Sequence, residues 1–152
     1  MSDVYLNGEF IDGNLAKISV FDQGFLYGDG IFETFRSVDK KLYQFSSHYQ
    51  RLLQSAEALS YPVAFTQQQL EDILLELCER NGWNNAYYRI TITRGKGQIG
   101  FQRDMDNDLT CLIVGREFLG LDDRYYRQGI EVKVAQTRRN APEAISPKIK
   151  SI

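Results

Sequence analysis

Among the 18 lysine and arginine residues of this sequence, Arg51 and Lys150 are of types that could bind a phosphate or bond covalently to a carbonyl compound. Arg51 stands in the segment HYQRL (48–52), and its guanidinium group offers forked donors that suit phosphate oxygens and does not deprotonate. Lys150 stands in PKIKS (147–151), and a lysine amine can bond covalently to a carbonyl carbon. Lys148 is the competing candidate for that role. Because isolated arginines and lysines are usually solvated surface charges, both residues need support from other motifs.

Several other chemical signals predict little. GKGQIG (95–100) matches G-x-G-x-x-G, but a dinucleotide site needs a helix N-terminus after the loop, and residues 101–108 are a poor helix. We therefore interpret the segment as a glycine-rich loop. His48 is the only histidine, so we expect no histidine-rich metal site, and we interpret it as a helix-capping or surface residue rather than part of a hydrolase triad.

Three further motifs accompany the arginine and the lysine along the chain. They are VFDQGFLYGDGIFET (20–34), YYRITITRG (87–95) and TRRNAPE (137–143). In order and approximate spacing, the whole set resembles the class IV family of pyridoxal-phosphate enzymes. That family contains branched-chain aminotransferases, D-amino acid aminotransferases and 4-amino-4-deoxychorismate lyases. The similarity extends from about Tyr5 to the last residue.

The resemblance implies a role for each matching residue. Lys150 corresponds to the lysine that binds pyridoxal 5'-phosphate as a Schiff base, and Arg51 corresponds to the arginine that grips the cofactor phosphate. The positions matched to the substrate side are Phe25, Tyr27, Tyr87, Arg89 and Arg94. Strand alternation places Tyr87 and Arg89 on one face and Tyr88 and Arg94 on the other, so at most one pair points squarely into a pocket unless the strand ends or bulges.

The resemblance also implies an activity. We expect an aminotransferase that moves an amino group between an amino acid and a 2-keto acid, in a homodimer. The alternative is 4-amino-4-deoxychorismate lyase, which releases pyruvate and 4-aminobenzoate, and the TRG segment (93–95) favours D-amino acid aminotransferases and lyases over branched-chain enzymes. Members usually continue well beyond the lysine, so we expect a truncated chain that binds the cofactor weakly. An inactive fragment or dimerising domain is the alternative of another class.

Composition is that of a globular protein with small-molecule partners. The chain has 152 residues, of which 43% are hydrophobic and 25% charged, enough for one ordinary core. Its net charge of -2 provides no general attraction for nucleic acid or anionic membranes. The apolar runs are far shorter than the roughly 20 residues of a membrane span, so we expect a cytoplasmic protein. Cys78 and Cys111 are expected to be buried, reduced thiols.

Hydrophobic periodicity predicts an α+β fold: an N-terminal antiparallel sheet with two helices, followed by the start of a second β-rich domain. One helix is expected from a cap at Ser46 or Ser47 to about Leu59. The other is expected from a capping box at 66–69 to a stop at 81–82. The strands are expected at 4–6, 9–11, 18–21, 31–36, 42–45, 86–93, 110–115 and 130–134.

The expected domains follow from a change in composition after Gly115. Residues 1–115 form the N-terminal α+β domain and residues 116–129, charged and turn-prone, form an interdomain linker. Residues 130–152 begin an incomplete C-terminal cofactor-binding domain, and they are too few to bury a core of their own.

Overall fold

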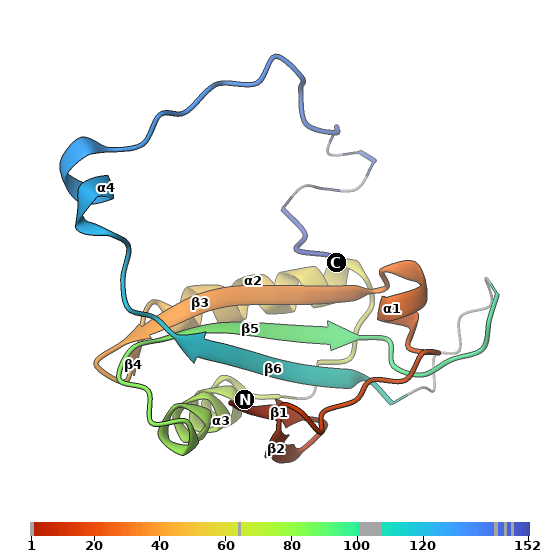
Figure 1. The fold of residues 1–152 in the computed structure, drawn as a ribbon. Helices are drawn as coiled ribbons and strands as arrows, with labels where there is room; N and C mark the ends of the chain where they lie inside the picture. The colour runs from red at the N-terminus through yellow and green to blue at the C-terminus, as the bar shows by residue number, and fades with distance from the viewer. Residues whose placement is uncertain (1, 64, 101–107, 142, 145, 147) are drawn as a thin grey trace.

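A single antiparallel sheet dominates the computed structural model, which describes residues 2–63, 65–100, 108–141, 143–144, 146 and 148–152. The strand order is β2-β1-β6-β5-β3-β4 (Figure 1). The strands are β1 (Asp3–Leu6), β2 (Glu9–Asp12), β3 (Gly30–Val38), β4 (Lys41–Leu42), β5 (Ala86–Thr93) and β6 (Thr110–Glu117). The helices are α1 (Gln23–Tyr27), α2 (Phe45–Ala58), α3 (Gln67–Arg80) and α4 (Asp123–Gln128). The predicted α+β class with an antiparallel sheet is confirmed.

Two short turns close hairpins, and the first lies between the strands predicted at 4–6 and 9–11. Asn7 and Gly8, with φ of 49° and 100°, join β1 to β2, and Asp39 and Lys40, with φ of 48° and 59°, join β3 to β4. Positive φ at both central residues matches the right-handed twist of the flanking strands. The first and third strands are thereby fixed in register with their neighbours.

The two long helices begin differently from each other. α3 has the predicted capping box, because the Thr66 hydroxyl accepts from the Gln69 amide and the Gln69 side chain accepts from the Thr66 amide. The predicted serine cap of α2 is wrong. Its N-cap is Gln44 in the left-handed region, with φ of 49° and no side-chain capping bond, and Ser46 and Ser47 lie inside the first turn. The helix therefore starts two to three residues earlier than a cap at Ser46 or Ser47 would place it.

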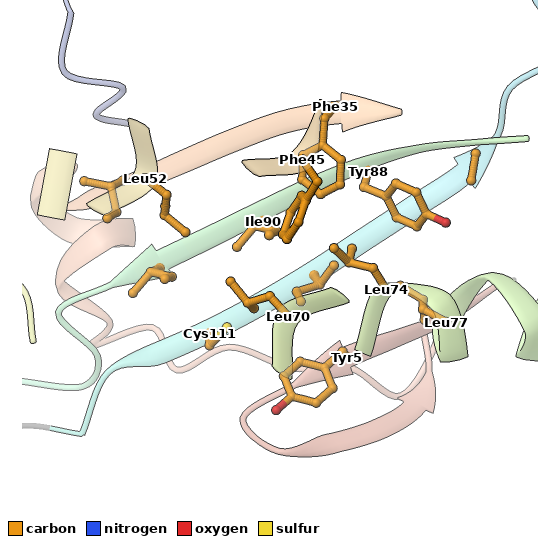
Figure 2. Close-up of a cluster of buried hydrophobic side chains, with 14 of the residues drawn as sticks. Tyr5, Phe35, Phe45, Leu52, Leu70, Leu74, Leu77, Tyr88, Ile90 and Cys111 are labelled. Atoms are coloured by element: carbon orange, nitrogen blue, oxygen red, sulfur yellow. The ribbon is translucent and has the colours of Figure 1, made fainter. Parts of the chain in front are cut away.

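The core lies between the sheet and the helices α2 and α3 (Figure 2). Alternate residues of β5 point into it, and so do residues three and four apart on each helix. The fully buried side chains include Leu52, Leu70, Leu74, Leu77, Tyr88, Ile90 and Ile92. Cys78 and Cys111 are free and buried, as predicted.

Two predicted strands are absent from the described structure. Residues 18–21 form a loop before α1, and residues 130–134 are exposed and irregular. A strand needs a neighbour for its backbone groups, and among the described residues none pairs with either segment. β6 continues to Glu117 and α4 lies inside the segment expected to be a linker, whereas the division into domains stays a prediction.

Beyond α4 the chain returns to the sheet, so that its last residues lie beside the beginning of β3 (Figure 1). In the part of the chain that the structure describes, no helix is long and apolar enough to cross a membrane. The described residues also hold no group of three or more His, Cys, Asp or Glu side chains placed to bind a metal ion. The expectation for the helix after the glycine loop falls on residues 101–107, outside the described residues.

Candidate functional site

A buried carboxylate, Glu33, organises the basic residues that the sequence singles out. The Glu33 side chain is 1% exposed, and its two oxygens accept from Arg51, Nε at 2.5 Å and Nη2 at 2.7 Å. His48 Nδ1 lies 3.0 Å from Glu33 Oε2, and Lys150 Nζ lies 3.8 Å from the same oxygen. One acid therefore holds two helical side chains and the candidate catalytic lysine around a single point.

Secondary structure explains why these groups meet. In β3, Ile31, Glu33 and Phe35 are buried on the face toward the helices, while Phe32 faces the other side. On α2, His48 and Arg51 are three residues apart, so they share a face. Because α2 packs against that face of β3, its basic stripe covers the carboxylate.

Glu33 was not predicted from the sequence, and the prediction for His48 was wrong. His48 neither caps α2 nor lies free on the surface, because its ring contacts Glu33 and packs 5.4 Å from the Phe35 ring. A signal for both was present: an acid between two apolar residues at alternate strand positions, followed by two basic residues at helical spacing. Such an acid reaches the core only with cations beside it, since an unpaired buried charge is costly.

The charges in this cluster shift one another's ionisation. Burial by itself would raise the pKa of Glu33, but hydrogen bonds from Arg51 and His48 and the charge of Lys150 lower that pKa below its ordinary value. The hydrogen bond between Arg51 and Glu33 also raises the pKa of Arg51. His48 Nδ1 lies between the two partners, 3.0 Å from Glu33 Oε2 and 3.2 Å from Arg51 Nη2. The cluster is therefore charged at neutral pH.

Arg51 and Lys150 open onto one cavity of about 530 Å³. The residues that line it are Phe32, Arg51, Gln54, Arg139, Lys148, Ile149, Lys150 and Ser151. Four of these described residues are cations and none is acidic, so the lining favours an anionic ligand. Lys150 Nζ also lies 5.1 Å from the centre of the Phe32 ring. The two residues identified by sequence are therefore brought together.

Two of the predicted substrate-side residues lie on the open face of the sheet beside this cavity. The Arg89 guanidinium stacks on the Phe32 ring, 3.9 Å from its centre, and its Nε donates to Thr91 Oγ1 at 3.2 Å. Tyr87 is 38% exposed, with the Arg116 guanidinium 5.5 Å from its ring centre. Phe32 thus stands between Arg89 and Lys150 as a shared aromatic surface.

Arg94 lies on the other side of the sheet, as strand alternation predicted. It is 3% exposed, donates to the carbonyls of Leu59 and Ser60 at 2.9 and 3.1 Å, and lies 3.5 Å from Asp29. Its guanidinium also stands 4.1 Å from the centre of the Tyr61 ring. The structure therefore does not bring Arg94 to the cavity, and in this arrangement Arg94 ties the end of β5 to the end of α2.

Phe25 and Tyr27 lie on α1, directly before β3, and they do not line the cavity described above. α1 is anchored by the buried Asp22, whose carboxylate accepts from the amides of Gly24 and Phe25 and from the hydroxyl of Thr93. Phe25 is 73% exposed and Tyr27 is 47% exposed. Both aromatic rings are thus presented at the edge of the sheet for further contacts.

Comparison with protein families gives a match over most of the chain. The model of the family described as amino-transferase class IV matches residues 30–152. A Methanocaldococcus jannaschii protein, whose name assigns it to the branched-chain-amino-acid aminotransferases, is 33% identical over 98% of this chain and 51% of its own length. The D-alanine aminotransferase of Staphylococcus haemolyticus is 40% identical over 62% of this chain and 34% of its own length. The chain therefore spans about a third to a half of these relatives.

Solved structures share the fold. The branched-chain amino acid aminotransferase of Escherichia coli superposes with a TM-score of 0.89 at 25% identity, covering 99% of this chain and 51% of that one. The 4-amino-4-deoxychorismate lyase of Pseudomonas aeruginosa gives a TM-score of 0.67 at 23% identity, covering 84% and 44%. The second likeness is one of fold alone.

Proposed function

Since the chain belongs to the class IV aminotransferase family, we propose that the protein moves an amino group between an amino acid and a 2-keto acid, using pyridoxal 5'-phosphate carried by Lys150. The observation that carries this proposal is the convergence of Arg51 and Lys150 on one cation-lined cavity above Glu33. The sequence relatives favour the aminotransferase over the lyase, because both of those compared above are aminotransferases by name.

The residues present fit this cofactor. A phosphate ester is a dianion, and Arg51, Arg139 and Lys148 supply cations from three points of the lining. Arg51 is already oriented, because Glu33 occupies its Nε and one hydrogen of Nη2 and leaves Nη1 as a donor for an outside oxygen. When bound, the cofactor spreads the negative charge that develops as the substrate loses its α-proton.

Lys150 then has two tasks. Its amine would carry the cofactor, and when a substrate amine takes its place on the cofactor it could accept the substrate proton and return it, because Nζ lies at the same cavity. Glu33 keeps a negative charge 3.8 Å from Nζ, and Phe32 covers one side of it. These contacts hold the amine at one end of a long, flexible side chain.

We propose that Arg89 binds the substrate carboxylate. Arg89 is oriented by its stacking on Phe32 and its bond to Thr91, and no carboxylate of the described residues lies within salt-bridge distance of it. Tyr87, on the same face, would form the wall beyond it. Phe25 and Tyr27 belong to the proposed substrate side as residues at the edge of the sheet, whereas the buried position of Arg94 supports a structural role instead.

A homodimer is also part of the proposal. Apolar side chains are exposed along the segment before and within α1, namely Leu15, Ile18, Val20, Phe21, Phe25, Leu26 and Tyr27. A cluster of this kind is typical of a protein interface. Sedimentation equilibrium should give the mass of a dimer, and a monomer at every concentration would contradict this part of the proposal.

The reaction is tested by keto-acid-dependent transfer of an amino group from branched-chain amino acids or D-alanine. Wild type should be active, Lys150→Ala should be inactive, and Lys133→Ala, which removes an exposed lysine outside the cavity lining, should keep most of the activity. Equal loss in both variants would remove Lys150 from its role. Release of pyruvate from aminodeoxychorismate without a keto acid would favour the lyase.

A further inference from the structure

A single antiparallel bridge, between Ile31 and Ser151, joins the last three residues of the chain to the beginning of β3. The Phe32 amide donates to the Lys150 carbonyl at 2.9 Å, and the Ile152 amide donates to the Gly30 carbonyl at 3.1 Å. The backbone on both sides of Ser151 is therefore held by the first residues of β3. The origin of the Lys150 side chain is fixed by the same sheet that carries Glu33.

Glycines allow this close approach. A Cβ on Gly30 would stand 2.6 Å from Ile152 Cδ1 and 3.0 Å from the Ile92 carbonyl oxygen. At Gly28, where φ is +68°, a Cβ would stand 3.1 Å from the carbonyl oxygen of Ile152. The absence of a side chain at Gly28 and at Gly30 thus leaves room for the segment that carries Lys150.

The backbone amide of Lys150 does not bond to β3. In a continuing antiparallel ladder the Lys150 amide would donate to the Phe32 carbonyl, as its partner in a hydrogen-bonded pair. In the structure this amide instead donates to Ser55 Oγ, at 3.3 Å. Ser55 is 2% exposed and lies four residues after Arg51 on α2, so both side chains lie on one face of the helix.

We propose that Ser55 is a positioning residue for Lys150, and this inference rests on the proposed function of that lysine. The Ser55 hydroxyl marks the point at which the chain turns onto β3, so it sets where the side chain of Lys150 begins. Glu33 and Phe32 act at the far end of the same side chain. Fixing both ends keeps Nζ in one place despite the flexible stem between them.

The test compares Ser55→Ala with Ser46→Ala in the full chain. Ser46 is an exposed serine of the same helix, so its replacement controls for the loss of a hydroxyl from α2. Two quantities are measured: hydrogen exchange of the Lys150 amide by NMR, and the rate at which added pyridoxal phosphate is trapped on Lys150 by borohydride. Ser55→Ala should speed the exchange of the Lys150 amide and slow the trapping of pyridoxal phosphate, each about tenfold. A tenfold change corresponds to about 1.4 kcal/mol. Ser46→Ala should change neither.

Unchanged exchange at Lys150 in Ser55→Ala would overturn the inference, and so would faster exchange spread evenly over the whole sheet. If Ser55→Ala does not fold, Ser55→Thr, which keeps the hydroxyl, should exchange at the wild-type rate, and faster exchange in that variant would equally contradict the role. If wild type itself traps no pyridoxal phosphate on Lys150, the proposed function fails. The exchange comparison then still decides whether Ser55 holds the segment.

Discussion

Replacing Glu33 by Gln tests the charge arrangement at the base of the site. Gln keeps the shape and one acceptor oxygen, but it removes the charge that faces Arg51, His48 and Lys150. Removing one partner of a buried ion pair costs about 3–5 kcal/mol. Since the Arg51 side chain is 41% exposed and water can replace part of the lost contact, we expect a loss of about 2 kcal/mol in the free energy of unfolding.

The stabilisation that Glu33 provides depends on pH. The pKa of Glu33 is lowered in the folded protein from its ordinary value of 4.5. The stabilisation is therefore complete above that ordinary value and is lost as the pH falls through the folded-state pKa. The advantage of wild type over Glu33→Gln should accordingly be full at neutral pH and should shrink in acid.

Urea unfolding of both proteins at a series of pH values measures this difference. Glu57→Gln is the matched control, because Glu57 is exposed on α2 and makes no ion pair within the part of the chain that the structure describes. The control should unfold like wild type throughout. If the difference in the free energy of unfolding between wild type and Glu33→Gln stays constant from neutral to acid pH, the charge of Glu33 is not the source of the stabilisation.

Other substitutions test separate contacts. Arg51→Lys keeps a cation beside Glu33 but loses the forked donors. The affinity for pyridoxal phosphate, measured by titration, should therefore fall about tenfold with the fold retained. Unchanged affinity would mean that Arg51 does not bind the phosphate. Gly24→Ala would place a Cβ 2.3 Å from Thr93 Cγ2, so unfolding should be easier by about 1–3 kcal/mol, and wild-type stability would show that α1 shifts freely. Thr66→Ala removes the cap of α3 and should cost about 1 kcal/mol in thermal or urea unfolding, whereas no loss would mean that solvent replaces the cap.

Local chemistry made much of the fold predictable. The Asn7-Gly8 turn depends on residues that accept positive φ, and the α3 capping box depends on two side chains three residues apart. Each of these signals is complete within a few neighbouring residues. The residues that pair the strands, by contrast, lie far apart in the sequence, and residues 130–134 show that a strand pattern without a partner does not form a strand.

The site was predictable only in part for the same reason. Arg51 and Lys150 were found through their motifs, but the residue that joins them, Glu33, stands in a strand whose apolar and polar residues do not alternate cleanly, since Phe32 faces the open side. The contact from Ser55 to the Lys150 backbone spans 95 positions, so no local pattern reports it. Distant residues become neighbours only through the packing of α2 on β3.

Reduction with borohydride in the presence of pyridoxal phosphate, followed by peptide mapping, identifies the lysine that carries the cofactor. Weak binding of the cofactor by this chain stays a prediction, and the structure docks Lys150 against β3 and α2, beside Arg51. We expect the pyridoxyl group on Lys150, and we expect Lys150→Ala to leave this peptide unlabelled. A label on Lys148, or no label on either lysine, would contradict this expectation.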